Sequence, residues 1–112
     1  MANEPLEVLF YATIEPQEPI AYVQATSGPA VDRLWEIDVL YICSQASSEV
    51  AISLKQLLGG TDEILLLHGT NILVGETVTI GPLGMINAHS IEAMAVGGNI
   101  DLIAYGRELT VS

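Results

Sequence analysis

The sequence predicts an all-β protein, a single antiparallel β-sandwich of the jelly-roll kind, and three observations support this prediction. Short apolar segments with period-two alternation recur along the chain. Turn residues separate them about every 8 to 12 residues, giving about seven or eight strands. No segment has the apolar spacing of a long helix. We divide the 112 residues into an N-terminal arm, residues 1–19, and one β-sandwich domain, residues 20–112.

The N-terminal arm is apolar in its middle and carries proline and carboxylates at both ends. Pro5, Pro16 and Pro19 lack a backbone N–H, which disfavours a helix or a central strand and favours an extended arm or an edge strand. Several apolar side chains of the arm need a covering surface, which either the chain's own sandwich or a neighbouring subunit provides. These side chains are Leu6, Val8, Leu9, Phe10 and Tyr11.

The first half of the sandwich domain contains three predicted strands, at 20–24, 34–44 and 49–55. The segment 34–44 has the longest alternation, and we expect its aromatic side to face the core. Because only a short turn separates it from 49–55, the two are predicted to form a β-hairpin. The expected core side carries Trp35, Ile37, Val39, Tyr41 and Cys43, and the opposite side carries Leu34, Glu36, Asp38, Leu40 and Ile42.

The second half contains a continuous apolar run at 63–68, which is typical of a strand buried on both sides. Strands at 71–74 and 77–80 follow. The segments 91–96 and 100–105 alternate on either side of Gly97-Gly98, which predicts a second hairpin. On the side of this hairpin away from the core, where a lone sandwich normally shows polar residues, apolar residues indicate contact with another protein. They are Met94, Val96, Ile103 and Tyr105.

Composition and charge narrow the class of partner. Half of the residues are apolar and only 15% are charged, so that one small core leaves apolar surface to be covered. The formal charge of −11 opposes binding to nucleic acid or to an anionic membrane surface. One cysteine excludes an internal disulfide. The N-terminus lacks the features of a signal peptide and no apolar stretch is long enough for a membrane span, so we expect a soluble protein made in the cytosol.

No group of residues predicts catalysis, a metal site or a bound cofactor. His68 and His89 have no second ligand at zinc spacing, so each is interpreted as a structural histidine. Cys43 has no neighbouring base and is interpreted as a buried thiol rather than a nucleophile. Glu36 and Asp38 share one strand side, which we interpret as solvated rather than as an acid–base pair.

Three segments together resemble a widespread group of small phage virion proteins. They are VLYICSQASSEVAISL, NILVGETVTIGPLGM and SIEAMAVGGNIDLIAYGRE, within the range Ala21 to Leu109. The matching motifs are Ile42-Cys43-Ser44, Gly75-Glu76-Thr77, Ile91-Glu92-Ala93-Met94-Ala95 and Gly98 through Tyr105-Gly106-Arg107-Glu108. The chain departs from the group at Asn87-Ala88-His89-Ser90, where a glycine-aspartate turn is usual, and in the arm, which has no counterpart there.

The resemblance implies a non-enzymatic structural protein with a jelly-roll or β-sandwich fold that assembles as a homotrimer on the virion. The main expectation is a decoration (cement) protein that binds the major capsid protein on the outer capsid surface. A neck or tail-fibre adaptor is the alternative within this class, and a carbohydrate- or receptor-binding module is the alternative outside it.

Two sets of residues are expected to make these protein contacts. The predicted capsid contact is the apolar part of the arm defined above. The predicted self-interface could instead pack under a second sheet or under the arm within one chain. Its residues are Leu40, Ile42, Met94, Val96, Ile103 and Tyr105.

Overall fold

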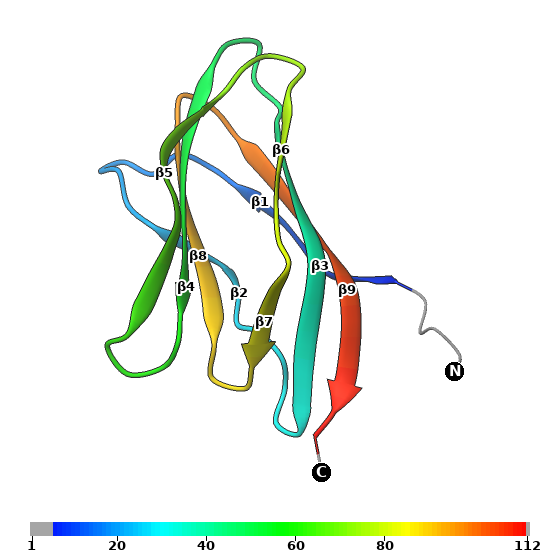
Figure 1. Cartoon of the computed structure of the whole chain (residues 1–112). Helices are drawn as coiled ribbons and strands as arrows, with labels where there is room; N and C mark the ends of the chain where they lie inside the picture. The colour runs from blue at the N-terminus through cyan, green and yellow to red at the C-terminus, as the bar shows by residue number, and fades with distance from the viewer. Residues whose placement is uncertain (1–5, 112) are drawn as a thin grey trace.

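The structure, a computed structural model, describes residues 6–111, which form nine β-strands and no helix (Figure 1). The strands are β1 (Glu7–Ile14), β2 (Val23–Thr26), β3 (Arg33–Ser44), β4 (Val50–Leu57), β5 (Glu63–Ile72), β6 (Thr77–Ile80), β7 (Leu83–Ile86), β8 (Ser90–Val96) and β9 (Ile100–Thr110). The all-β prediction is confirmed. Residues 1–5 of the predicted arm and residue 112 lie outside the described range.

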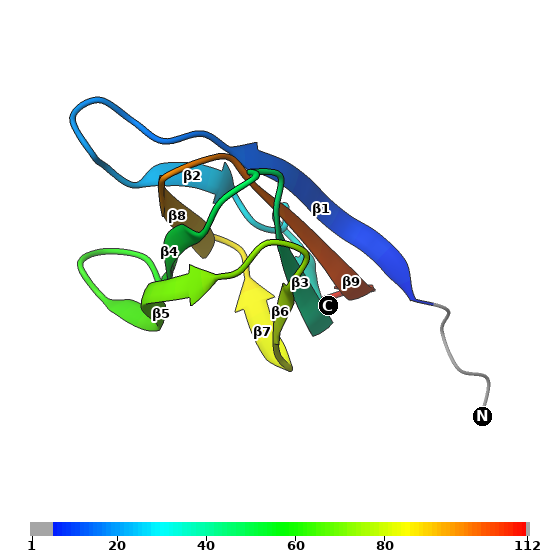
Figure 2. The same cartoon turned by 90° about the horizontal axis from the view of Figure 1, so that it is seen from above.

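The strands form two antiparallel sheets that pack face to face. Sheet A has the order β1-β9-β3-β6, with β7 also paired to β3, and sheet B has the order β2-β8-β4-β5. Figure 2 shows the two sheets from above as separate layers. The space between them is filled by apolar side chains from both sheets, which is the arrangement of a β-sandwich.

The pairing of strands is that of a jelly roll. If β6 and β7 count as two halves of one bent strand, the eight strands pair first with last, second with seventh, third with sixth and fourth with fifth. Gly81 and Pro82 separate the two halves, and proline has no N–H to donate to the neighbouring strand. This pairing is a long hairpin rolled up into two sheets.

Both predicted hairpins are wrong, although their strands form. β3 and β4 lie in different sheets, and so do β8 and β9, so each pair is joined by a connection that crosses the sandwich. Alternation shows which residues face inward, and it is identical for a hairpin within one sheet and for two strands that face each other across the core. The hairpin that the sequence analysis did not predict is β4–β5.

The apolar part of the predicted arm is an edge strand of the sandwich. β1 pairs with β9 from Glu7 to Ile14, so the chain's own sheet is the surface that covers it. Phe10 stacks on Trp35 with ring centroids 6.1 Å apart, and Ile14 is buried in the core. Residues 7–14 therefore belong to the sandwich rather than to an extension outside it.

A β-bulge in β3 reverses which side chains face the core. Ile37 lies opposite Gly106 and Val39 lies opposite Tyr105, so that Asp38 is an extra residue on β3. Before the bulge Trp35 and Ile37 are buried as predicted. After it the prediction is wrong, because the alternation has shifted by one residue. Leu40 and Ile42 are fully buried, whereas Val39, Tyr41 and Cys43 are only partly buried or exposed and face outward.

Gly106 makes the close approach at this bulge possible. A Cβ at Gly106 would overlap the carbonyl oxygen of Glu36 on β3. A glycine in a strand marks such contacts between backbones, because every other residue would force the strands apart. The glycine of the C-terminal motif is therefore explained by the bulge.

Most of the buried apolar core comes from four strands, β3, β4, β8 and β9, and β1, β5 and β7 each add one residue. The run at 63–68 was predicted to be buried on both sides, but β5 is an edge strand and Ile64 and Leu65 are 46% and 54% exposed. Fully buried large side chains include Ile37, Leu40, Ile42, Ile52, Leu54, Ile72, Met85, Ile91, Ile100 and Leu102.

Candidate functional site

The outer face of sheet A carries a continuous group of apolar and aromatic side chains. Antiparallel pairing aligns side chains of β1, β9, β3 and β6 in rows across the strands. Two of the rows are mostly apolar or aromatic, and the third is mostly polar. The first row is Val8, Tyr105 and Val39, the second is Tyr11, Ile103, Tyr41 and Thr79, and the third is Thr13, Asp101, Cys43 and Thr77.

A shallow hollow of about 570 Å³ lies in this face. The rings of Tyr41 and Tyr105 meet edge to face inside it, with centroids 5.7 Å apart and an interplanar angle of 84°. This geometry is favourable for aromatic pairs and holds both rings in place. The lining residues are Leu6, Val39, Tyr41, Cys43, Thr77, Ile103 and Tyr105.

One end of the face carries a hydrogen-bonded carboxylate. Asp101 Oδ1 accepts hydrogen bonds from Thr13 Oγ1 at 2.7 Å and from the Tyr11 hydroxyl at 3.3 Å. Its Oδ2 accepts one from Gln45 Nε2 at 2.6 Å. Asp101 therefore connects β1 and β9 to the β3–β4 connection and fixes the position of the Tyr11 ring.

The other end of the face carries an ion pair. Arg107 Nη1 lies 3.2 Å from Asp38 Oδ1, and Asp38 is the extra residue of the β3 bulge. The centre of the face, between this pair and Asp101, contains no charged side chain in its first two rows. An apolar centre with a polar periphery is typical of a protein–protein contact surface.

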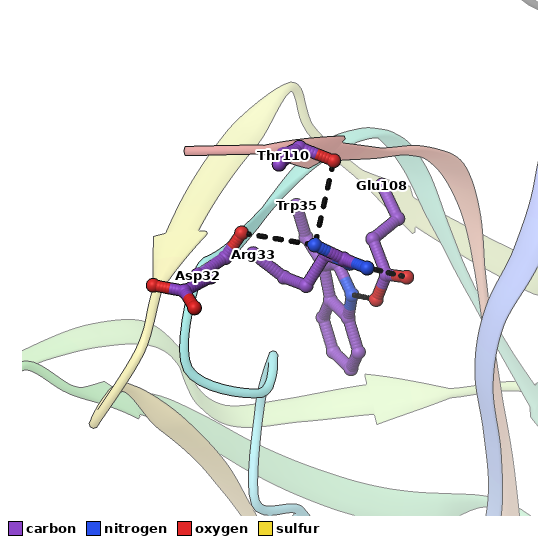
Figure 3. Close-up of polar contacts among 5 residues, drawn as sticks. All are labelled: Asp32, Arg33, Trp35, Glu108 and Thr110. Atoms are coloured by element: carbon purple, nitrogen blue, oxygen red, sulfur yellow. Dashed lines mark hydrogen bonds and ion pairs between the residues drawn. The ribbon is translucent and has the colours of Figure 1, made fainter. Parts of the chain in front are cut away.

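The tryptophan of the chain is anchored just inside this end of sheet A. Trp35 Nε1 donates a hydrogen bond to Glu108 Oε2 at 2.9 Å, and Arg33 Nε lies 3.8 Å from Glu108 Oε1 (Figure 3). Arg33 Nη1 also donates to Thr110 Oγ1 at 3.4 Å and to the carbonyl of Asp32 at 3.3 Å. The buried indole N–H is thus satisfied, as buried polar groups require.

The outer face of sheet B is built around a lysine. Lys55 Nζ lies 3.2 Å from Glu63 Oε2, 3.8 Å from Glu92 Oε1 and 4.2 Å from the centroid of the Tyr22 ring. The hydrogen bond to Glu63 is the main cause that raises the pKa of Lys55 above its ordinary value of 10.5, against the desolvation that lowers it. These contacts tie β4 to both of its neighbours in sheet B.

The predicted self-interface is divided by the structure into three places. Ile103 and Tyr105 lie on the outer face of sheet A. Met94 and Val96 face outward as predicted, but they lie on sheet B, on the opposite side of the sandwich.

Leu40 and Ile42 are core residues and cannot contact another subunit. The sequence analysis missed Val39, Tyr41 and Cys43, which share the outer face of sheet A. The available signal was the change from acidic to apolar along the other side of the same strand, which marks the bulge at Asp38.

The predicted capsid-contact residues also separate. Phe10 and Leu9 pack against the core, whereas Leu6, Val8 and Tyr11 are 50%, 53% and 59% exposed. These three continue the outer face of sheet A along its edge strand.

Of the residues considered for chemistry, Glu36, Asp38 and Cys43 lie on the outer face of sheet A, and the two histidines lie elsewhere. His89 Nδ1 accepts a hydrogen bond from the backbone N–H of Ile86 at 3.3 Å in the β7–β8 turn, and His68 is exposed on β5. Glu36 is exposed on β3. Within residues 6–111, no three His, Cys, Asp or Glu side chains come close enough together to hold a metal ion.

The candidate site is therefore the outer face of sheet A, with its apolar centre and its polar ends. None of the described residues forms a helix that could cross a membrane. Comparisons with protein families, curated proteins and solved structures gave no match to this chain.

Proposed function

We propose that this chain is a structural protein of a virion, a decoration protein that assembles as a trimer on the outer capsid surface and stabilises the shell. The observation that carries the proposal is the outer face of sheet A, whose two central rows hold aromatic and aliphatic side chains and no charge. The motif resemblance described above adds the virion as the setting for this contact.

The shape and charge of the protein suit such a role. A jelly roll is a rigid support, since its two sheets share one packed core. The strongly acidic surface, with a formal charge of −11, would not compete for packaged nucleic acid. The exposed side chains of Leu6, just before the edge strand β1, and of Val8 and Tyr11 on β1 lie on this same face and would be covered together with it.

A carbohydrate-binding module is the alternative that one observation favours. Tyr11, Tyr41 and Tyr105 share a face with Asp101 and Gln45, and sugar sites combine aromatic rings with hydrogen-bonding groups. However, Tyr41 and Tyr105 meet edge to face rather than presenting a flat platform. We therefore rank protein contact above sugar binding.

Counting copies of the chain on purified particles tests the proposal. Quantitative mass spectrometry should find a copy number comparable with that of the major capsid protein. A small fraction of that number would support a neck or tail-fibre adaptor instead, and absence from the particle would contradict both virion roles. Binding to a glycan array would support the carbohydrate alternative.

The role of the outer face of sheet A in binding to the shell is tested with purified shells that lack the chain. Val8→Asp should reduce shell binding by at least about tenfold, since it places an unpaired charge in an apolar contact. Leu65→Asp, at an equally exposed position on β5 of sheet B, is the matched control and should bind normally. Equal loss of shell binding in both variants would contradict a role for the outer face of sheet A.

A further inference from the structure

We propose that the outer face of sheet A is the surface through which three copies of this chain associate, with each face turned toward a common three-fold axis. The proposal rests on the proposed function, because it locates the trimer contact on one side of the sandwich. It replaces the divided set of residues predicted from the sequence by one continuous surface.

Electrostatic repulsion excludes most of the surface from self-association. Each copy carries a formal charge of −11, so identical copies repel one another wherever carboxylates meet. The two central rows of sheet A carry no charge. The outer face of sheet B has Glu63 and Glu92 around Lys55, and self-association there would bring carboxylates of different copies together. On sheet A the carboxylates lie at the two ends of the face, Asp101 at one end and Glu36 and Asp38 beside Arg107 at the other, so copies can approach along its uncharged centre.

The width of sheet A fits three-fold closure. Where β6 pairs with residues 40–43 of β3, sheet A is four strands wide, β1-β9-β3-β6, and at a strand spacing of about 4.8 Å this is about 19 Å. Three such sheets arranged as the sides of a triangular prism lie about 5 to 6 Å from its axis. Packed sheets are about 10 Å apart, so half of that spacing matches the distance to the axis. The side chains of three faces therefore fill the space between them.

The directions of the edge strands support the same arrangement. Each neighbouring pair in sheet A is antiparallel, so the two edges, β1 and β6, run in opposite directions. At each corner of the prism, β1 of one copy would meet β6 of the next in antiparallel orientation. The outer edges of both strands could then form backbone hydrogen bonds between copies.

The three rows would become layers around the axis. Tyr105 and Val39 form one apolar layer, and Ile103 and Tyr41 form the next. Asp101 with its hydrogen-bond donors and the Arg107–Asp38 ion pair lie beyond them at opposite ends. The arrangement gives an apolar centre closed by polar groups at both ends, as in stable interfaces.

Two aspartate substitutions on opposite faces test the proposal. Ile103→Asp should abolish the trimer in native mass spectrometry and light scattering at concentrations where the unmodified chain is trimeric, because three unpaired charges would lie beside the axis. Met94→Asp, which is likewise partly buried but on sheet B, should stay trimeric. Circular dichroism and Trp35 fluorescence verify that each variant is folded. If Ile103→Asp does not fold, Tyr41→Ser tests the same layer from an exposed position.

A second measurement uses the unmodified chain. Cys43, the single cysteine, lines the hollow of this face and should become covered in the trimer. Its alkylation by N-ethylmaleimide should slow at least about tenfold as the protein concentration rises through the range where the trimer forms. An alkylation rate that does not depend on assembly would overturn the proposal.

The oligomeric state and the assembly of the two aspartate variants also test the trimer interface. A dimer would overturn three-fold closure, and loss of assembly in Met94→Asp with retention in Ile103→Asp would move the interface to sheet B. A stable monomer at high micromolar concentration would overturn the proposal altogether. These outcomes are separate from copy number on the particle, so a trimer that is absent from the virion would contradict the proposed function alone.

Discussion

The two outer faces of the sandwich differ although the same alternation builds both. On sheet A, the outward positions of β9 and β3 are occupied by Ile103, Tyr105 and Tyr41, and the centre carries no charge. On sheet B, the centre is Lys55, held between Glu63 and Glu92. One face is suited to close contact with a protein, whereas the other carries its own satisfied ion pairs.

This difference shows that apolar content alone does not locate an interface. Met94 and Val96 are as apolar as the residues of sheet A, but they lie beside a charged cluster on sheet B. An interface requires neighbouring apolar residues on one surface, and neighbours are set by strand order.

The largest loss of stability is expected at Leu40, just after the bulge that determines which side chains of β3 face outward. Leu40→Ala should destabilise the protein by about 2–5 kcal/mol, because it leaves a cavity in a fully buried site. Tyr41→Ala, one residue later on the outer face, should cost less than about 1.5 kcal/mol. Urea unfolding followed by Trp35 fluorescence, at a concentration where the chain is monomeric, measures both. The reverse order would mean that β3 has no bulge at Asp38.

A smaller loss of stability is expected at Gly106, the glycine opposite the bulge. Gly106→Ala should cost about 1–3 kcal/mol, because the new methyl group overlaps the carbonyl oxygen of Glu36 and forces β3 and β9 apart. Gly84→Ala, where the added carbon would make only an ordinary contact with the Trp35 carbonyl, is the control and should unfold close to the unmodified protein. Equal stabilities in urea would contradict the close approach.

The smallest loss of stability is expected at Lys55, the charged centre of sheet B. The pKa of Lys55 is raised above 10.5 in the folded protein, mainly by Glu63, so the fold favours the protonated form. The stabilisation is therefore complete below about pH 10.5 and is lost as the pH rises through the raised pKa. Lys55→Met should lower Tm modestly near pH 8, and the difference from the unmodified protein should shrink above about pH 10.5.

Lys55→Arg is the matched control for this prediction. Arginine stays charged throughout the same pH range, so the stability of the Lys55→Arg protein should not converge on that of the Lys55→Met protein. A difference between Lys55→Met and the unmodified protein that stays constant up to the alkaline limit would contradict the contribution of the ion pairs.

Part of the candidate site could be predicted from the sequence. Ile103 and Tyr105 follow from simple alternation in β9, which is regular with respect to β3 up to the bulge. Tyr41 was assigned to the wrong side, because a single inserted residue at Asp38 reverses the sides of the strand, and the change from acidic to apolar on its other side was the sequence signal of that bulge. The sequence did not show which surface covers the N-terminal arm, since the edge pairing of β1 with β9 depends on a partner about 90 residues away.

By itself, the sequence determined the fold class, the position of most strands and the inward residues of β8 and β9, because alternation with period two reflects burial on one side of a strand. Only the tertiary structure decided strand order, the crossing connections and the division of the outward apolar residues between two faces. These depend on contacts between segments far apart in the chain, and local alternation contains no information about which distant strand becomes a neighbour.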